Sequence, residues 1–213
     1  STNIAKTLSG DLIRVLAARI NEHAKDVDAV FMPAVVGLDG CADVVRLKEY
    51  VDRPLHFLST LPPSVPGIRL QLMLKRYFQK LGGTYMLGDS VTGGDFEDGR
   101  LKAITTRNHG DFKFEADNFI LATGSLFSKG LVSDMDGVRE PVFGLDVDFL
   151  SGRSQWYKKN MFDAQPYMSF GVSVGDDFNV FRNGKRVDNL YAAGAVLSGF
   201  NALKEGSGAG VSI

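Results

Sequence analysis

The chain has 213 residues, of which 44% are hydrophobic and 10% aromatic, so we expect one large or two small domains with a sizeable core. Lysine and arginine number 24 against 25 acidic residues, a balance that offers no charge excess for nucleic acid or an anionic membrane. One cysteine, Cys41, excludes an internal disulfide, and three histidines without a Cys/His cluster indicate no metal site. We therefore expect a cytoplasmic protein that meets a membrane only through a partner, because no apolar run nears the roughly 20 residues that span a bilayer.

The first part of the chain predicts a β-α-β unit. Residues 13–24 carry apolar side chains at helical spacing, which predicts an amphipathic helix. The apolar run 28–37 ends in glycine and is typical of a strand buried on both faces. A helix over 41–50 and a strand over 54–58 follow, so a parallel strand pair is expected. His56, inside the second strand, is expected to be buried and structural.

A proline-rich stretch and a strongly amphipathic helix come next. Three prolines in residues 60–71 predict an extended loop, and Gly82-Gly83 is expected to stop the helix that follows. Basic side chains take the solvent side of this helix, opposite an apolar face. Arg69 falls in the expected first turn, where its charge opposes the helix dipole. Arg69 is therefore a candidate anion ligand; the alternative is a surface arginine paired with a distant carboxylate.

From residue 84 the apolar period changes to two, and the Asp98-Gly99 turn predicts a hairpin or small meander. An apolar strand follows and ends in a small hydroxyl residue and a glycine. Ligands of open α/β sheets bind beyond the carboxyl ends of strands, where a glycine lets a planar cofactor approach the backbone. The predicted cofactor-binding residues here are Thr123, Gly124 and Ser125.

Residues 126–187 contain most of the remaining aromatic side chains and predict a β-rich insertion or cap. Within this stretch Arg139 and Glu140 could line a pocket or form an ordinary exposed pair. His109, in the preceding meander, has the chemistry of a general base, but a solvent-exposed histidine is the favoured interpretation. The catalytic residues are therefore unknown.

The last segment, residues 189–213, combines a small-residue strand with a glycine cluster and predicts a strand, a loop and a helix start. Glycines there leave backbone N–H groups unshielded, a favourable place for phosphate or flavin oxygens. The predicted cofactor ligands are Gly194, Gly206, Ser207, Gly208 and Gly210. A flexible tail is the alternative, because glycine and serine also mark linkers. A helix that opens with nothing after it leads us to expect a longer polypeptide.

The order of these elements is that of a flavoprotein and predicts an α/β fold of the FAD/NAD(P)-binding type with a β-rich insertion. We expect residues 1–66 to form the β-α-β segment, as part of a substrate or cap region. Residues 67–125 and 188–213 are expected to form the flavin-binding domain, and residues 126–187 the insertion. A nucleotide-binding transferase is disfavoured, because the chain has neither a phosphate-binding Gly-x-x-x-x-Gly-Lys-Ser/Thr loop nor an evident acidic pair for magnesium.

Three blocks resemble the B subunit, a flavoprotein, of the anaerobic glycerol-3-phosphate dehydrogenase: residues 60–71, residues 137–147 and the glycine-rich end. The resemblance runs from about Val27 to Ile213, and its first two blocks are its specific part, since the glycines occur in many flavoproteins. The family's N-terminal Gly-x-Gly-x-x-Gly unit, which would cradle a dinucleotide pyrophosphate, is not found in this chain. Related flavoproteins carry an acidic residue after the last strand, where this chain has Ala195 and Val196.

The resemblance implies a flavin-bearing subunit of an enzyme that oxidises sn-glycerol 3-phosphate to dihydroxyacetone phosphate and passes electrons to quinone, with fumarate or nitrate as terminal acceptors. It implies FMN as the cofactor, with FAD as the alternative. The implied partners are a larger flavoprotein subunit and an iron–sulfur subunit that anchors the complex at the inner face of the cell membrane. Arg69 and Arg139 are the candidate ligands of the substrate phosphate. The competing interpretation is a structural subunit that supports a catalytic flavoprotein partner without a flavin of its own.

Overall fold

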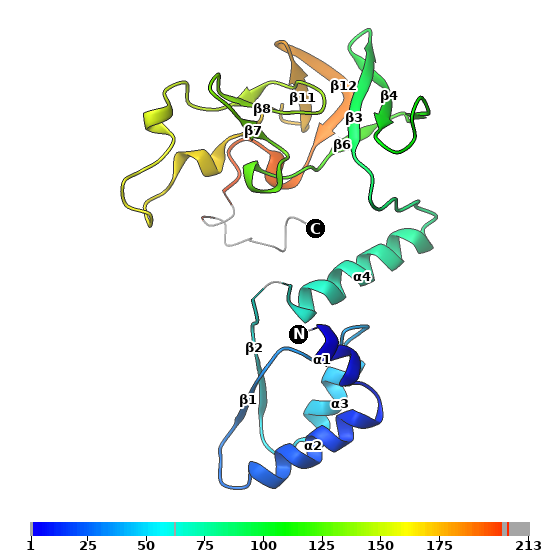
Figure 1. The fold of residues 1–213 in the computed structure, drawn as a ribbon, viewed down its shortest axis with the longest axis vertical. Coiled ribbons are helices and arrows are strands. Elements are labelled where there is room, and N and C mark those ends of the chain that lie inside the picture. Colours follow the sequence, from blue (N-terminus) through cyan, green and yellow to red (C-terminus); the bar gives the residue numbers. More distant parts are fainter. Residues whose placement is uncertain (1, 62, 202–203, 205–213) are drawn as a thin grey trace. The chain divides into compact units, whose positions relative to one another are not determined.

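A computed structural model describes residues 2–61, 63–201 and 204. The chain divides into two compact units, Ser1–Met86 and Leu87–Ile213 (Figure 1). Each unit has its own hydrophobic core. This division does not coincide with the segment boundaries expected after residues 66, 125 and 187. Those boundaries describe a flavin-binding domain and stay predictions.

The first unit contains the predicted β-α-β arrangement. Strands β1 and β2 pair in parallel, with Val30 opposite Leu55, and helix α3 lies between them in sequence. The buried side chains Ile13, Leu47 and Leu55 bring α2, α3 and β2 into one core. The elements are α1 (Thr2–Thr7), α2 (Asp11–His23), β1 (Val30–Pro33), α3 (Ala42–Tyr50), β2 (Leu55–Leu58) and α4 (Val65–Lys80).

Among the residues that the structure describes, side chains cover one face of the β1–β2 pair. Val30 and Met32 pack against the core of the unit, whereas Phe31 is 63% exposed. His56 lies opposite Phe31 in the register, is exposed, and stacks on its ring at a centroid separation of 5.1 Å. The predictions of a strand buried on both faces and of a buried His56 are therefore wrong, because the helices of this unit pack on one side of the pair.

Helix α4 begins earlier than its sequence pattern suggests. Ser64 is the N-cap and accepts a hydrogen bond from the Gly67 N–H at 3.2 Å, and Pro66 occupies the first turn, where its missing N–H costs nothing. Arg69 thus lies beyond the first turn, and the expected extended loop is shorter. The helix ends at Lys80, just before Gly82-Gly83, as predicted. Val65, at the start of the helix, is buried, but six apolar side chains of the rest of the helix and its C-cap are between 42% and 70% exposed: Leu70, Met73, Leu74, Tyr77, Phe78 and Leu81.

The second unit begins with the predicted antiparallel meander, in the order β3-β4-β5. Asp98 and Gly99 join β3 to β4 with φ angles of 50° and 74°. Positive φ at both central residues matches the twist of the flanking strands, which is why Asp-Gly forms this turn. The strands are β3 (Val91–Glu97), β4 (Arg100–Thr106) and β5 (Lys113–Glu115).

The second sheet of this unit has the order β11-β12-β6 and contains the parallel pair on which the site is built. Strand β6 (Phe119–Leu121) runs parallel to β12 (Lys185–Ala192), and β11 (Asn179–Arg182) runs antiparallel to β12. Asn183-Gly184 turns β11 into β12, as its sequence predicts. Asn189, on β12, is buried and joins this sheet to the meander through the backbone of Leu101.

The stretch between β6 and β11, expected to be rich in β-structure, is built from short strands and 3-10 helices. The short strands are β7 (Val132–Ser133), β8 (Val138–Arg139), β9 (Val147–Asp148) and β10 (Gly171–Val172). The 3-10 helices are η1 (Leu126–Ser128), η2 (Arg153–Gln155), η3 (Pro166–Ser169) and, after β12, η4 (Gly194–Val196). Their buried side chains join those of β6, β11 and β12 in the core of this unit.

Candidate functional site

The carboxyl ends of β6 and β12 lie side by side, because the two strands are parallel neighbours. Leu121 is opposite Ala192, and the Ala193 N–H donates to the Leu121 carbonyl at 2.9 Å. The segments that follow, 122–125 and 193–196, therefore leave the sheet at one edge. The structure thus brings the predicted residues Thr123, Gly124, Ser125 and Gly194 to adjacent loops.

The loop after β6 closes on itself around Ser125. The Ser125 carbonyl accepts hydrogen bonds from the N–H groups of Ser128 at 3.2 Å and Gly130 at 3.1 Å. The Ser125 hydroxyl oxygen accepts a third, from the Phe127 N–H at 3.3 Å, and can still donate its own proton. Gly124 turns the chain into this loop with φ +83°, a conformation that favours glycine.

The loop after β12 also turns at a glycine, since Gly194 has a φ of 75°. Beyond η4 the chain crosses β10, where the Ser198 N–H donates to the Val172 carbonyl at 3.1 Å. A side chain at Gly171 would place its Cβ 2.2 Å from the Leu197 carbonyl carbon, so two backbones meet here. Both loops are therefore held by backbone contacts that require glycine.

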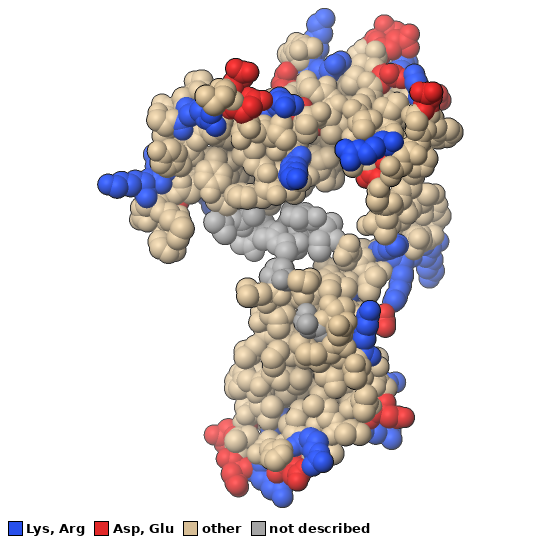
Figure 2. Space-filling view, in the orientation of Figure 1, with Lys and Arg blue, Asp and Glu red and all other residues tan. Residues whose placement is uncertain are grey.

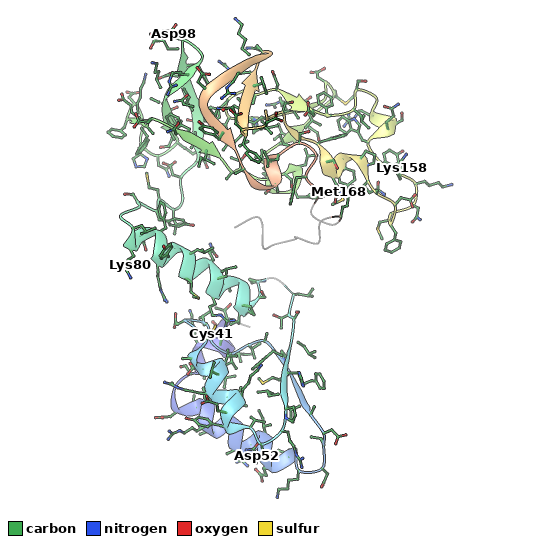
Figure 3. The ribbon with its side chains drawn as sticks, turned by 180° about the vertical axis from the view of Figure 1, so that it is seen from behind. Cys41, Asp52, Lys80, Asp98, Lys158 and Met168 are labelled. Atoms are coloured by element: carbon green, nitrogen blue, oxygen red, sulfur yellow. The ribbon has the colours of Figure 1, made fainter. Side chains whose placement is uncertain are left out.

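A small cavity of about 60 Å³ lies against these two loops. Its lining carries no charged side chain and consists of Ser125, Leu126, Phe127, Tyr167, Met168, Ala195 and Phe200; Met168 is labelled in Figure 3. Pockets that enclose a ligand typically measure about 300–1,000 Å³. The loops after β6 and β12 could contact a flavin from one side, because they present glycine backbone and the Ser125 hydroxyl. The residues that line this cavity do not enclose a flavin, and none of their side chains is a carboxylate, a histidine or a lysine.

Gly206, Ser207, Gly208 and Gly210 lie outside the described residues, so their role in cofactor binding stays a prediction. Among the described residues, no group of three or more His, Cys, Asp or Glu side chains could hold a metal ion.

The two candidate phosphate ligands lie in different units. In the first unit, Arg69 donates from Nη1 to the Gly37 carbonyl at 2.8 Å. In the second, Arg139 donates from Nε to Asp134 Oδ2 at 3.1 Å, and this hydrogen bond lowers the pKa of the Asp134 carboxyl. Each guanidinium has five N–H donors, so both keep donors for an anion. Their role in substrate binding stays a prediction.

Glu140 differs from its neighbour Arg139, because its side chain is only 1% exposed. Its two carboxylate oxygens accept the backbone N–H groups of Val142 at 2.8 Å and Phe143 at 2.7 Å. The alternative that Arg139 and Glu140 form an exposed pair is therefore wrong: the carboxylate is a buried acceptor that fixes the turn after β8.

His109 lies in the meander loop between β4 and β5, exposed to solvent as predicted. Its Nδ1 atom is 2.7 Å from Asp89 Oδ2 and 2.9 Å from Thr106 Oγ1. Hydrogen bonding by the Thr106 hydroxyl, with further bonds from nearby N–H groups, lowers the pKa of Asp89 to about 2. Sequence reasoning missed Asp89, because 20 residues separate it from His109.

The depressed pKa of Asp89 predicts a specific pattern of acid sensitivity. Its folded value of about 2 lies below the ordinary 3.8, so the ionised carboxylate stabilises the folded state above about pH 4. That contribution is lost as the pH falls toward 2. We expect the difference in Tm between wild type and Asp89→Asn to shrink as the pH falls from about 4 to 2. Thr106→Val should show a smaller change in the same window, and a pH-independent difference would contradict this role for Asp89.

Comparison with known proteins decides the family. Residues 7–211 match the family described as "FAD binding domain". The chain belongs to this family. Membership confirms the α/β flavoprotein fold expected from the order of its elements, and it supports a flavin as the cofactor. No solved structure matches the chain.

The curated relatives of this FAD-binding chain are B subunits of the anaerobic glycerol-3-phosphate dehydrogenase, the family that residues 60–71 and 137–147 resemble. It is 40% identical over 214 residues to the B subunit of the anaerobic glycerol-3-phosphate dehydrogenase of Yersinia pseudotuberculosis, covering 100% of this chain and 50% of the relative. The proteins of the same name from Pectobacterium carotovorum and Aliivibrio fischeri (strain MJ11) are 41% and 39% identical, with 51% of each relative and 100% and 99% of this chain covered. The chain thus spans about half the length of the curated relatives it matches, and the expected resemblance is confirmed.

No helix of the described FAD-binding chain has both the length and the apolar character needed to cross a membrane.

Proposed function

We propose that this chain provides one side of the flavin site in a subunit of an enzyme that oxidises sn-glycerol 3-phosphate to dihydroxyacetone phosphate and passes electrons to quinone, with fumarate or nitrate as terminal acceptors. One observation carries the proposal: the parallel strands β6 and β12 end side by side in loops that turn at Gly124 and Gly194, both with positive φ. In open α/β sheets such an edge is where ligands bind. The name of the relatives supplies the substrate.

FMN is the proposed cofactor, with FAD as the alternative. Bound at this edge, a flavin supplies the acceptor for the hydride of the substrate. Thr123, Gly124 and Gly194 would let it approach the backbone, and the Ser125 hydroxyl would donate a hydrogen bond to one of its polar atoms. Gly206, Ser207, Gly208 and Gly210 are proposed to add backbone N–H donors.

The substrate phosphate is proposed to bind Arg69 or Arg139, since a guanidinium matches phosphate oxygens in pairs. In the structure Arg69 uses one nitrogen on Gly37, and Arg139 uses Nε on Asp134. The proposed partners are a larger flavoprotein subunit and an iron–sulfur subunit that holds the complex at the inner face of the cell membrane.

A second candidate function is a structural subunit that helps a flavoprotein partner without holding a flavin itself. The small cavity favours it, because about 60 Å³ with no charged lining cannot enclose a flavin within the described residues. Ala195, where related flavoproteins have an acidic residue, points the same way.

Filling the cavity should separate the two functions. Ala195 lines it, so we expect Ala195→Leu to weaken flavin binding about tenfold or more through overpacking at this wall. The measurement is flavin per polypeptide and the flavin dissociation constant in the intact protein purified with its partner subunits. Ala116→Leu, at an exposed alanine outside the cavity, is the matched control and should bind as wild type does.

A complex whose only flavin resides on the partner would support the structural subunit and overturn the flavin-bearing proposal. Unchanged flavin affinity in Ala195→Leu would remove this cavity from the site.

A further inference from the structure

The segment between η2 and η3, residues 157–163, forms a loop that projects from the strands of the second unit (yellow in Figure 1; Lys158 is labelled in Figure 3). Two adjacent apolar side chains are almost fully in water on it: Met161 is 77% and Phe162 is 87% exposed. Tyr157, at the start of the loop, is 62% exposed. Exposed apolar side chains that are adjacent in this way indicate a contact with something outside the unit.

Hydrogen bonds from two side-chain amides hold this loop in place. Gln165 is 9% exposed; its Oε1 atom accepts the Lys158 N–H at 2.8 Å, and its Nε2 atom donates to the Asn160 carbonyl at 2.8 Å. The Asn160 side chain accepts the Phe162 N–H at 3.2 Å and donates to Asp163 at 3.2 Å. One buried amide and one exposed amide thus hold the turn that presents Met161 and Phe162.

An aromatic cluster anchors the base of the loop. Trp156 packs edge-on against Phe170 at a centroid distance of 5.5 Å and against Phe149 at 6.2 Å. The Tyr167 N–H donates to the Trp156 carbonyl at 3.0 Å, which ties the two ends of the loop together. The packed aromatic cluster therefore holds the exposed loop in one conformation, so little conformational entropy would be lost when the loop binds a partner.

The charge of the loop is positive, although the whole chain has a formal net charge of −1. Lys158 and Lys159 are exposed directly before the apolar pair, and Arg153 lies over the Trp156 ring at 5.0 Å. The acidic side chain of the loop, Asp163, accepts the hydrogen bond from Asn160. Basic side chains protrude on this side of the unit in Figure 2.

The two lysines next to the exposed apolar pair favour a lipid surface over a protein as the partner of this loop. Lysine is depleted at the centres of protein–protein interfaces, where a charged ammonium would lose its water. At an anionic bilayer, apolar side chains enter the boundary between headgroups and acyl chains while lysines stay at the phosphates. We propose that loop 157–163 docks on an anionic lipid surface, with Met161 and Phe162 inserted and Lys158 and Lys159 at the headgroups. None of these residues lines the cavity near β6 and β12, so the proposal does not rest on flavin binding.

Vesicle sedimentation tests this docking with the 213-residue chain. We expect binding to phosphatidylcholine vesicles that contain about one-third phosphatidylglycerol, weaker binding to phosphatidylcholine alone, and release by high salt. Lys158→Gln with Lys159→Gln should lower the partition coefficient about tenfold or more, and so should Met161→Ser with Phe162→Ser.

Matched control variants remove positive charges or an apolar side chain at exposed positions outside the loop. Lys6→Gln with Lys25→Gln removes two positive charges, and Leu61→Ser removes an apolar side chain that is 89% exposed. Both should bind vesicles as wild type does. All variants change exposed residues, and an unchanged Tm verifies that each one folds. Because the chain has one tryptophan, the emission of Trp156 should shift to shorter wavelength on vesicle binding in the wild type and the controls.

Failure of the wild type to bind anionic vesicles would overturn the proposal, as would equal binding by the loop variants and the controls. If Met161→Ser with Phe162→Ser weakened assembly with other subunits while vesicle binding was absent, the loop would be a protein interface, and the lipid proposal would be wrong.

Discussion

Gly130→Ala is expected to lower the free energy of unfolding of the second unit by about 3 kcal/mol. A Cβ at this buried position would lie 1.9 Å from the Gly124 carbonyl oxygen and 2.6 Å from the Thr123 carbonyl carbon. Neither neighbour is a flexible side chain, so the backbone of the loop after β6 must shift. Urea denaturation followed by the fluorescence of Trp156, the one tryptophan, measures the change in this unit.

Gly93→Ala is the matched control for this substitution. Gly93 lies on β3 in the same unit, and the nearest atom to its added Cβ is Thr105 Oγ1 at 3.8 Å, an ordinary contact. We expect a change within about 0.5 kcal/mol there. A Gly130→Ala protein as stable as Gly93→Ala would show that the loop can open without cost. It would also weaken the case for a rigid wall beside Ser125.

Asn189→Leu is expected to cost about 4 kcal/mol, although leucine has nearly the same size and shape. Asn189 is 2% exposed, and its Oδ1 atom accepts the Leu101 N–H at 2.8 Å. Its Nδ2 atom donates to the Leu101 carbonyl at 2.8 Å and the Asp117 carbonyl at 3.1 Å. Leucine would leave these backbone groups without a partner, and each unsatisfied buried group costs about 1–3 kcal/mol.

Asp188→Ala changes the preceding residue on β12 and serves as the control for Asn189→Leu. The Asp188 side chain is 57% exposed, and its contact with Arg186 is 3.7 Å long. We expect a change within about 0.5 kcal/mol, since exposed ion pairs contribute little. The same urea titration compares the two variants. A loss below about 1 kcal/mol for Asn189→Leu would mean that water replaces the amide.

The two predictions concern the same architecture. Asn189 ties β12 to the meander, and Gly130 closes the loop that follows β6. Both strands end at the proposed flavin-facing edge. Loss of the Asn189 hydrogen bonds, or a side chain at Gly130, should therefore move the Ser125 loop relative to Gly194. We therefore expect both variants to reduce flavin content in the intact protein, whereas the two controls retain it.

Short-range features of the fold could be predicted from the sequence. The Asp98-Gly99 and Asn183-Gly184 turns were predictable because their residues tolerate positive φ, a property of the residue itself. Helices α2, α3 and α4 follow from apolar spacing within each segment. The sequence also indicates that Gly124 and Gly194 follow strands, and the carboxyl ends of parallel strands lie at the same edge of a sheet.

The tertiary structure decided what depends on residues far apart in the chain. Asn189 and Leu101 are separated by 88 positions, and no local pattern tells that this asparagine is buried against that backbone. The exposure of His56 and of the apolar face of α4 likewise depends on which surfaces other elements cover, a property that periodicity does not contain. By itself, then, the sequence determined helices α2, α3 and α4, the Asp98-Gly99 and Asn183-Gly184 turns and the family, because those follow from residue type and local spacing. Only packing decided which polar groups are buried and which apolar groups are left in water.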